Sequence, residues 1–398
     1  MCAQKRAAMR EIFEMALHFT QAEFAGRRAK LQAAMADAGF DGLLLFNPSS
    51  HFWLTGYDTF GFCFFQCLVV KADGSMVLLT RSADLRQAQL TSIIEDIRIW
   101  KDGVDANPAT DLAKLIAELG LDGGTLGIEY ETQGLTAANG MAVQAALSGQ
   151  ATLQDASRLV TRLRLVKSAA ELAYVEKAAE ICDKALDAAL ALAHPGGHEA
   201  RILAAMHEVS FAEGGDYPGN PFIVGSGDHA LLCRYQSGRR ALGAQDQLTL
   251  EWAGVMRQYH VAAMRTIPIG PVTDLQERLF AAAREALLAC EAELRPGRTM
   301  GDVFAAHAKT LDAHGLAAHR LNACGYSLGT VYAPCWMDWP MFYEGNPVEL
   351  APNMVMFLHM IIMDSDTQTA MCLGRTSLVE ANGARPLSRH PLELLAGC

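Results

Sequence analysis

Alternation of apolar and polar residues over positions 247–266 predicts a β-hairpin. Leucines alternate with polar residues over 247–251, which is the two-residue period of a strand buried on one face. The small pair Ala253-Gly254 predicts the turn, and a second alternating run returns over 259–266. We expect the rest of the chain to be arranged around this hairpin.

The same period places a carboxylate and an imidazole on the hairpin. Side chains two residues apart on a strand share a face, so His260 points the same way as Ala262 and Arg265 points the opposite way. Glu251 ends the first alternating run. Brought together, Glu251 and His260 would form an acid–base pair able to move protons.

The first 160 residues alternate between helical and strand patterns, which is typical of an α/β domain. The expected elements are a helix at 20–39, strands at 41–46, 67–71 and 75–80, a helix near 84–89, a strand at 96–100, a helix at 109–119 and a strand at 125–129. A last strand over 163–167 then leads to Ser168, with Glu171 three residues later, which predicts a helix with a capping box. We therefore expect two domains, residues 1–163 and 164–398.

The second domain mixes long helices with strands. Helices are expected from 168 to 192 and over 199–213, 274–294 and 302–315, and strands over 221–225, 230–235, 247–253, 258–268, 321–328, 353–363 and 369–380. A loop rich in proline and tryptophan spans 332–340. Since no glycine-rich turn follows a strand in the pattern of a phosphate-binding loop, a nucleotide site is not predicted.

Composition narrows the class of protein. The chain of 398 residues is 51% hydrophobic and 19% charged, with a net charge of −11 and a pI near 5.6. Such a composition is globular, and its acidity argues against a nucleic-acid partner. We find no apolar run long enough to span a membrane and no signal sequence. Ten cysteines without a Cys-x-x-Cys pair favour buried thiols in a reducing cytoplasm.

The order of motifs resembles one superfamily, that of creatinase, Xaa-Pro dipeptidase and methionine aminopeptidase. The matching points are Lys167-Ser168, Pro296-Gly297-Arg298-Thr299, Gly325-Tyr326-Ser327-Leu328-Gly329 and Arg265-Thr266. The resemblance covers essentially the whole chain and implies a pita-bread fold, a curved antiparallel sheet backed by helices. The fold class is thus an α/β N-terminal domain followed by an α+β pita-bread catalytic domain.

The peptidases of this superfamily hold two metal ions with two Asp, one His and two Glu. The resemblance places these ligands at Glu251, Ala262, Tyr326 and His359, and at Gly374 or Arg375. Two divalent ions need several carboxylates to balance their charge. Because one carboxylate remains, we expect no metal site and no cofactor.

Two relatives show metal-free chemistry in the same kind of cavity. Creatinase cleaves a C–N bond of a guanidino acid, and ectoine hydrolase opens a cyclic amidine, both with carboxylate and imidazole side chains. The histidine base of creatinase falls at Arg234 here, and its site glutamates fall at Met264 and His359. The resemblance therefore implies an architecture and a type of chemistry rather than a substrate.

Four residues are the catalytic candidates, and each has a structural alternative. Glu251 would be the base or the nucleophile, or else a structural ion-pair partner of an arginine. His260 and His359 would transfer protons, or else be core histidines. Tyr326 would donate a hydrogen bond to developing negative charge, or else be a hydrogen-bonded core tyrosine.

Six further residues are candidates for substrate binding. Arg234 and Arg265 could hold a substrate carboxylate in bidentate fashion, although Arg265 could also be structural. Trp336 and Asp338, in the 332–340 loop, could line an aromatic box for a cationic or zwitterionic ligand. From the aromatic stretch of the first domain come Tyr57 and Phe64, unless that stretch is core.

The sequence thus predicts a metal-independent hydrolase of a C–N bond in a small zwitterionic, amidine- or guanidino-type metabolite. The alternatives are an Xaa-Pro dipeptidase and an inactive protein that binds a ligand or partner. A cytoplasmic homodimer is expected, by analogy with creatinase-like relatives and because residues 52–65 carry more aromatic side chains than one small domain needs.

Overall fold

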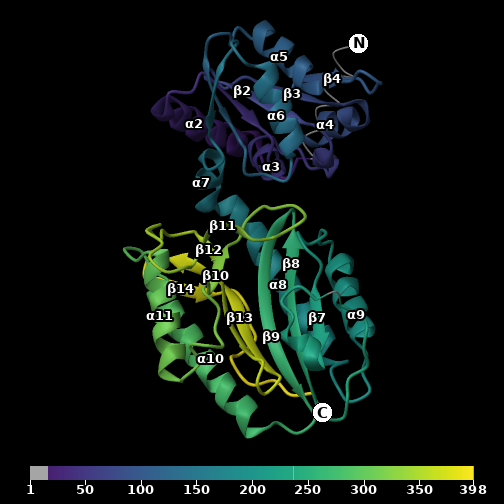
Figure 1. The fold of residues 1–398 in the computed structure, drawn as a ribbon, viewed down its shortest axis with the longest axis vertical. Coiled ribbons are helices and arrows are strands. Elements are labelled where there is room, and N and C mark those ends of the chain that lie inside the picture. Colours follow the sequence, from purple (N-terminus) through teal and green to yellow (C-terminus); the bar gives the residue numbers. More distant parts are fainter. Residues whose placement is uncertain (1–16, 236, 398) are drawn as a thin grey trace. The chain divides into compact units, whose positions relative to one another are not determined.

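The structure is a computed structural model that describes residues 17–235 and 237–397 (Figure 1). The chain divides into two compact units, Met1–Arg164 and Leu165–Cys398. Both parts of the predicted fold class are confirmed. The first unit is α/β, and the second is a curved antiparallel sheet with helices.

The N-terminal unit is built on a six-stranded mixed sheet in the order β4-β3-β2-β1-β5-β6. Its strands are β1 (Gly42–Leu45), β2 (Cys67–Lys71), β3 (Met76–Arg81), β4 (Asp96–Trp100), β5 (Thr125–Ile128) and β6 (Thr152–Asp155). Its helices are α2 (Gln21–Ala38), α3 (Pro48–Thr55), α4 (Leu85–Thr91), α5 (Pro108–Glu118), α6 (Ala137–Ala146) and α7 (Leu159–Leu165), with 3₁₀ turns η1 (Gly61–Cys63) and η2 (Ser82–Asp84).

The aromatic stretch of this unit mostly forms its core. Phe52 and Trp53, on α3, and Phe65, shortly before β2, are buried in this unit. Phe60 and Phe64, at the 3₁₀ turn, remain 81% and 49% exposed. Most of the stretch is therefore used inside the unit, and the homodimer stays a prediction.

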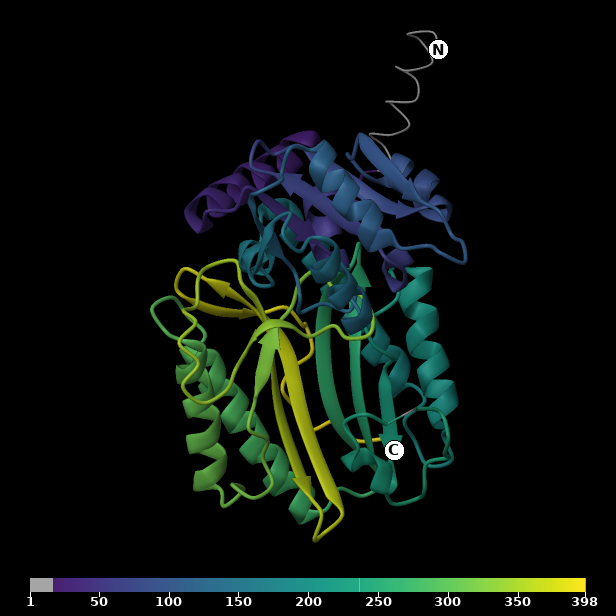
Figure 2. The ribbon, with the colours of Figure 1, turned by 45° about the horizontal axis from the view of Figure 1, so that its top comes forward.

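The C-terminal unit has a sheet in the order β11-β10-β12-β13-β9-β8-β7, with β14 paired to β13 (Figure 2). Its strands are β7 (Ile223–Ser226), β8 (Asp246–Met256), β9 (Tyr259–Ile269), β10 (Gly325–Ser327), β11 (Asp338–Met341), β12 (Val355–Asp364), β13 (Thr369–Glu380) and β14 (Gly383–Pro386). Its helices are α8 (Ala169–Leu190), α9 (Glu199–Ala212), α10 (Asp274–Glu293) and α11 (Met300–Ala313), with the 3₁₀ turn η3 (Gly227–Leu231). The pairings of this sheet are antiparallel.

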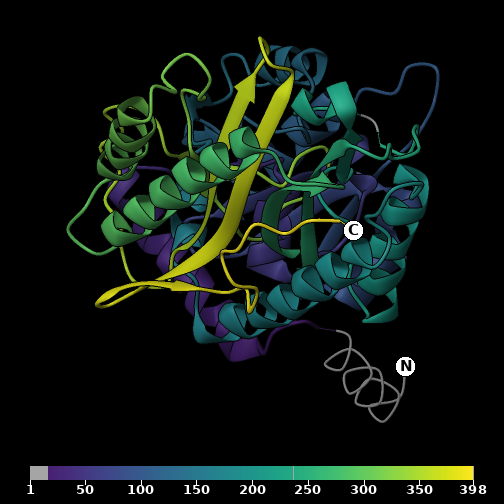
Figure 3. The ribbon, with the colours of Figure 1, turned by 90° about the horizontal axis from the view of Figure 1, so that it is seen from below.

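Helices cover one face of this sheet. Helix α8 packs on β8 and β9, and α10 packs on β12 and β13, as Figure 3 shows from below. The predicted capping box starts α8, since Ser168 accepts from the Glu171 N–H and Glu171 accepts from the Ser168 N–H. The cavity described below lies on the opposite face of the sheet.

The hairpin is confirmed, but its predicted turn is wrong. Strand β8 continues past Gly254 to Met256, and the chain reverses at Arg257-Gln258, where both residues have positive φ (49° and 66°). Gly254 has a different purpose, because a Cβ there would lie 2.0 Å from the Ala178 carbonyl oxygen of α8. The glycine allows close approach of helix and strand.

Two other predicted strands are wrong. Residues 163–167 overlap the end of helix α7. Residues 230–235 form the end of the 3₁₀ turn η3 and the irregular chain after it. Both segments are only five or six residues long, and over so short a stretch helix and strand cannot be told apart by period. Within residues 17–235 and 237–397, no helix combines the length and the apolarity needed to cross a membrane. The eight cysteines in these ranges are free thiols.

Candidate functional site

One row of paired residues crosses the second sheet and carries two of the candidates. His359 pairs with Gly374, Gly374 with Met264, Met264 with Glu251, and Glu251 with Ile223. Residues that pair directly across neighbouring strands share a face. Glu251 and His359 therefore lie on the same face of the sheet.

The remaining positions at which the resemblance places ligands lie on this face as well. Ala262 is two residues from Met264 on β9, and Tyr326 pairs with Phe357, which is two residues from His359 on β12. Since every second residue returns to the same face, the register unites the five positions.

A cavity of about 650 Å³ opens on this side of the sheet. Its volume falls in the range of roughly 300–1,000 Å³ that is usual for small-molecule sites. Four of the predicted site residues line it, namely Glu251, Tyr326, Arg234 and Trp336. The other lining residues are Leu203, His207, Asn220, Pro221, Phe222, Ile223, Tyr235, Ser237, Pro334, Cys335 and Met337. All of them belong to the C-terminal unit.

Glu251, Tyr326 and Trp336 form a buried chain of polar contacts in the cavity. The indole Nε1–H of Trp336 donates to the Tyr326 hydroxyl oxygen over 2.9 Å, and that hydroxyl points its O–H at Glu251 Oε1 over 3.5 Å. Tyr326 and Trp336 are 2% and 1% exposed. This chain orients the carboxylate and leaves its second oxygen without a hydrogen bond among the described residues.

Burial raises the pKa of Glu251 to about 7, although the nearby charge of Arg234 and the Tyr326 hydroxyl both act to lower it. Burial and the charge of Glu251 together raise the pKa of Tyr326 well above its ordinary value. At neutral pH the phenol therefore stays protonated and acts as a donor. The carboxyl is divided between its two forms, which suits a group that accepts and returns a proton.

Arg234 supplies a cation at the mouth of the cavity. It lies after η3 and is exposed, and its Nη1 donates to the carbonyl oxygen of Cys233 over 2.9 Å. Its positive charge lowers the pKa of Glu251, so the two side chains interact electrostatically. A cation over a buried carboxylate gives this cavity two poles of opposite charge.

His260 does not belong to the cavity, and its expected role in proton transfer is corrected. It shares the face of Glu251 but lies four residues farther along the hairpin, about 13 Å at 3.3 Å per residue. Its Nε2 accepts from the Gly219 N–H over 2.9 Å, and its Nδ1–H donates to the Gln258 carbonyl oxygen over 2.8 Å. Both nitrogens are thus engaged with backbone, and burial lowers the pKa of His260 to about 4.

The position of His260 instead helps to build the cavity wall. Gly219, which it holds, precedes Asn220, and Asn220 Oδ1 accepts from the Trp336 N–H over 3.2 Å. His260 therefore acts through the backbone on the segment that contacts Trp336. The sequence analysis placed this residue on the face of Glu251, and the structure places it farther along the hairpin than the cavity.

His359 lies beside Tyr326 rather than in the cavity lining. Its ring centroid is 5.7 Å from that of Tyr326, and its buried Nδ1 has no hydrogen-bond partner in the part of the chain that the structure describes. Burial and the neighbouring His307 lower the pKa of His359 to about 3, so the imidazole is neutral. It can influence Tyr326, but its direct contact with a ligand is not supported by this placement.

Arg265 lies on the opposite face of the sheet, which removes it as a substrate ligand. It pairs with Leu250 and Leu373, one residue out of step with Glu251. Its Nη1 donates to the carbonyl oxygens of Met264 (2.9 Å) and Gly374 (2.7 Å). Arg265 therefore ties strands together on the side that the helices cover.

Asp338, Tyr57 and Phe64 are also not in the cavity lining. Asp338 begins β11 opposite Ser327, and its Oδ1 accepts from the Trp339 N–H. Tyr57 is 1% exposed within the core of the N-terminal unit, so it cannot present its ring to a ligand there. Phe64 is exposed on that unit, with the Arg81 guanidinium 4.0 Å from its ring centre, and its role stays a prediction.

Sequence analysis missed an aromatic wall of the cavity. His207 of α9 stacks on Phe222 with ring centroids 4.3 Å apart and planes 5° from parallel, and Tyr235 lines the cavity nearby. Burial lowers the pKa of His207, which favours the neutral ring. These residues come from a helix and from two irregular segments, and no sequence period links them.

The side chains at the five ligand positions do not fit a pair of divalent ions. Glu251 is the one carboxylate, and Ala262 and Gly374 offer no side-chain donor. Among residues 17–235 and 237–397, no group of three or more His, Cys, Asp or Glu is arranged to hold a metal ion. Glu251, the Tyr326 phenol and the His359 imidazole cannot balance the charge of two such ions.

Comparisons with known proteins agree with the two-unit architecture. The chain is similar to ectoine hydrolase from Halomonas elongata, at 26% identity over 346 residues, with 83% of this chain and 86% of the relative covered. It is similar to the probable dipeptidase PepE from Mycobacterium tuberculosis, at 28% identity over 334 residues, with 83% and 85% covered. The two are about equally similar, so identity alone does not separate a dipeptidase from a hydrolase of another kind.

Solved structures give the same fold. Dipeptidase PepE from Mycobacterium ulcerans superposes with a TM-score of 0.82 at 26% identity, covering 95% of this chain and 99% of that one. The Xaa-Pro dipeptidase from Bacillus anthracis superposes with a TM-score of 0.81 at 21% identity, covering 94% and 99%, which is evidence of fold alone.

Family models match most of the chain. The Creatinase/Prolidase N-terminal domain matches residues 27–166, and Metallopeptidase family M24 matches residues 173–381. The second match covers more than half of the chain and nearly all of the sheet that carries Glu251. The chain therefore belongs to metallopeptidase family M24, a family of hydrolases, and carries a creatinase/prolidase-type N-terminal domain.

Proposed function

We propose that the protein is a metal-independent hydrolase of a C–N bond in a small zwitterionic metabolite of amidine or guanidino type. The observation that carries this proposal is the donor set on the cavity face. Glu251 is the one carboxylate among the five ligand positions, and Ala262 and Gly374 provide no ligand where a metallopeptidase would need one. Similarity to ectoine hydrolase supports the same class of substrate.

Glu251 is the group that would move the proton. With its pKa raised to about 7 by burial, its carboxylate is a base of suitable strength near neutral pH. It would take a proton from water as the water oxygen forms a bond to the amidine or guanidino carbon. The same proton would then pass to the leaving nitrogen as the C–N bond breaks, which returns Glu251 to its starting form.

The other side chains of the cavity would bind and orient. Arg234 would hold a substrate carboxylate, and Glu251 would attract the cationic end before the reaction. Tyr326 would keep the carboxylate in place through its O–H, with Trp336 fixing the phenol in turn. His359, beside Tyr326, would support this chain from behind.

The metal content of the purified protein is the first test. We expect well below one divalent ion per chain by elemental analysis, because the donors at the ligand positions cannot hold a pair. A chelator should leave hydrolysis of guanidino acids or cyclic amidines unchanged. About two ions per chain, with Xaa-Pro cleavage restored by manganese, would identify a dipeptidase instead. Absence of turnover on guanidino acids, amidines and dipeptides alike would indicate a binding protein.

The pH profile is the second test. If the charged form of Glu251 is the base, kcat/KM should fall about tenfold per pH unit below the pKa near 7. Because the raised pKa belongs to an acid, the active form is present above pH 7 and lost as pH falls. A kcat/KM that stays flat between pH 5 and 7 would remove Glu251 from this role.

A further inference from the structure

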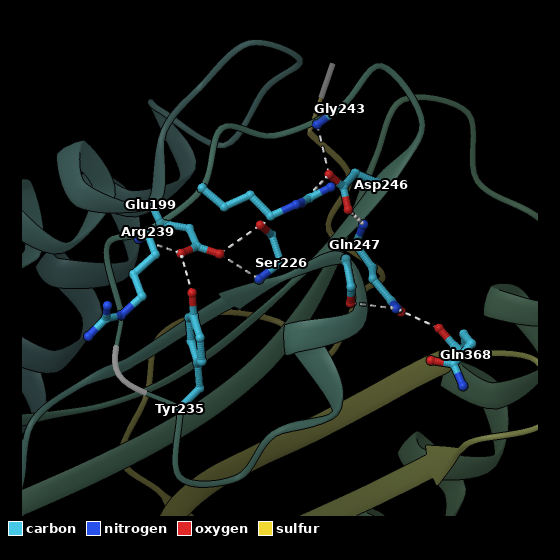
Figure 4. Close-up of polar contacts among 10 residues, drawn as sticks. Glu199, Ser226, Tyr235, Arg239, Gly243, Asp246, Gln247 and Gln368 are labelled. Carbon is cyan, nitrogen blue, oxygen red and sulfur yellow. Dashed lines mark hydrogen bonds and ion pairs between the residues drawn. The ribbon is translucent and has the colours of Figure 1, made fainter.

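Glu199, the first residue of α9, is a fully buried carboxylate that lies outside the cavity lining. One oxygen, Oε1, accepts from both the N–H (2.8 Å) and the hydroxyl (2.7 Å) of Ser226. The other oxygen, Oε2, accepts from the Arg239 N–H (2.9 Å) and the Tyr235 hydroxyl (3.3 Å) (Figure 4). Its two oxygens therefore serve two different stretches of chain.

These two stretches flank the residues that form one wall of the cavity. Ser226 ends β7, and the segment Gly227–Tyr235, hereafter the Arg234 segment, begins directly after it. Arg239 follows this segment, and Tyr235 closes it while lining the cavity. Glu199 thus holds the chain before, at the end of and beyond the segment that carries Arg234.

The donors around Glu199 make its burial tolerable. An ionised carboxylate taken out of water is strongly unfavourable unless hydrogen bonds replace its hydration. Four donors on two oxygens provide this replacement. Glu199 is not needed to cap α9, because His198 already caps this helix by accepting from the Ala200 N–H.

A second carboxylate extends the same network to the sheet. Asp246, at the start of β8, accepts from the Arg240 guanidinium (2.6 Å) and from the Gly243 N–H (2.7 Å). The same guanidinium donates to the Ser226 hydroxyl oxygen over 2.7 Å. Figure 4 shows Glu199, Ser226 and Asp246 in one connected group, so the anchor of the Arg234 segment is continuous with the strand that bears Glu251.

Gln247 adds a contact to the beginning of the Arg234 segment. Its side-chain amide donates to the carbonyl oxygens of Gly227 (3.1 Å) and Gln368 (2.8 Å). The guanidinium of Arg234, by contrast, is exposed and bonds to the carbonyl of its own neighbour, Cys233. The place of this cation is therefore decided by the backbone that Glu199 and Gln247 hold.

We propose that Glu199 is a positioning residue, which sets Arg234 over Glu251 by holding Ser226 on one side of the Arg234 segment and Arg239 on the other. The assignment of Arg234 to substrate binding rests on the proposed function. The position of the cation itself can be tested without any substrate.

Glu199→Gln separates the two sides of the interaction. An amide has one accepting oxygen, so it can serve either Ser226 or the Tyr235 and Arg239 pair, but not both. We expect the oxygen to stay with Ser226, whose two donors are at 2.7 and 2.8 Å. Hydrogen exchange resolved to single amides should then accelerate at least about tenfold at Arg239 and stay near its original rate at Ser226.

The control is Glu208→Gln, which makes the same change at an exposed position of the same helix. Both amides should exchange as in the unchanged protein. A general loss of stability in Glu199→Gln would instead accelerate both amides together and would overturn the assignment. Unchanged exchange at both amides would overturn it as well.

Titration of the Glu251 carboxyl group reports on the position of Arg234. Its charge lowers the pKa of Glu251, so displacing it should raise that pKa further. We expect isotope-edited infrared titration to find the same upward shift in Glu199→Gln and Arg234→Ala, and no added shift when the two changes are combined. A shift in Arg234→Ala alone would show that Glu199 does not position the cation.

With a hydrolysed substrate, KM and kcat give a third measurement. Glu199→Gln should raise KM about tenfold and leave kcat within about threefold, and it should have no further effect on KM in an Arg234→Ala background. Additive effects would overturn the link between the two residues. Failure to find any substrate would count against the proposed function, whereas exchange and titration would still decide the role of Glu199.

Discussion

Replacing Glu251 with glutamine is expected to reduce turnover by on the order of 10⁴-fold, the upper end of the range for a positioned proton-transfer group. The amide keeps the shape of the side chain and can still accept from the Tyr326 hydroxyl. It cannot take a proton from water at neutral pH. Steady-state kinetics on a guanidino acid or cyclic amidine would measure the loss.

The fold should survive this change. A neutral amide is easier to bury than a carboxylate whose pKa burial has raised to about 7, so the midpoint of thermal unfolding should stay the same or rise. Asp338→Asn is the matched control. It makes the same change from carboxylate to amide, but at a residue that does not line the cavity, so it should change kcat little. Activity of Glu251→Gln within tenfold of the unchanged protein would exclude Glu251 as the base.

Removing the guanidinium of Arg234 should act on binding rather than on chemistry. A hydrogen-bonded charge pair is worth about 1.5–3 kcal/mol, so Arg234→Ala should raise KM by roughly 10- to 150-fold. Because Glu251 and Tyr326 are untouched, kcat should change much less. The measurement is a comparison of KM and kcat for a substrate that carries a carboxylate and for its neutral amide.

Arg239→Ala is the control for this prediction. It removes the same charge shortly after the Arg234 segment, and the side chain does not line the cavity. The contact of Arg239 with Glu199 is made by its backbone N–H, which alanine retains. Equal rises in KM for both variants would point to general electrostatic attraction rather than to a binding contact at Arg234.

The face of each strand residue could be predicted from sequence, because it depends only on the two-residue period. On the hairpin this period placed His260 and Ala262 on one face and Arg265 on the other, which agrees with the register, although the turn was misplaced. Tyr326 and His359 lie on other strands and were named from the resemblance. Arg265 stands one residue out of step with Glu251 and faces the helices, yet it was kept as a candidate. A strict use of the period would have removed that arginine from the candidates at the start.

The position of a residue along its strand, relative to the cavity, could not be predicted in the same way. His260 has the correct face but lies near the hairpin end, where two backbone groups engage its ring. The walls of the cavity come from Tyr235, Trp336 and other residues of irregular segments. Such segments carry no period, and their positions follow from hydrogen bonds such as those of Glu199, which only the folded chain reveals.

The glycine at position 254 has a consequence for how the cavity can adapt. Where a Cβ would stand, the Ala178 carbonyl oxygen lies 2.0 Å away and the Cys182 nitrogen 2.5 Å away, so β8 and α8 touch backbone to backbone. The Trp252 indole N–H adds a hydrogen bond to the Cys182 carbonyl oxygen over 2.8 Å. Helix and strand therefore form a stiff support close to Glu251. A ligand must adjust to the carboxylate, and any accommodation of size or shape falls to the opposite wall, where Arg234 and Trp336 are carried by irregular chain.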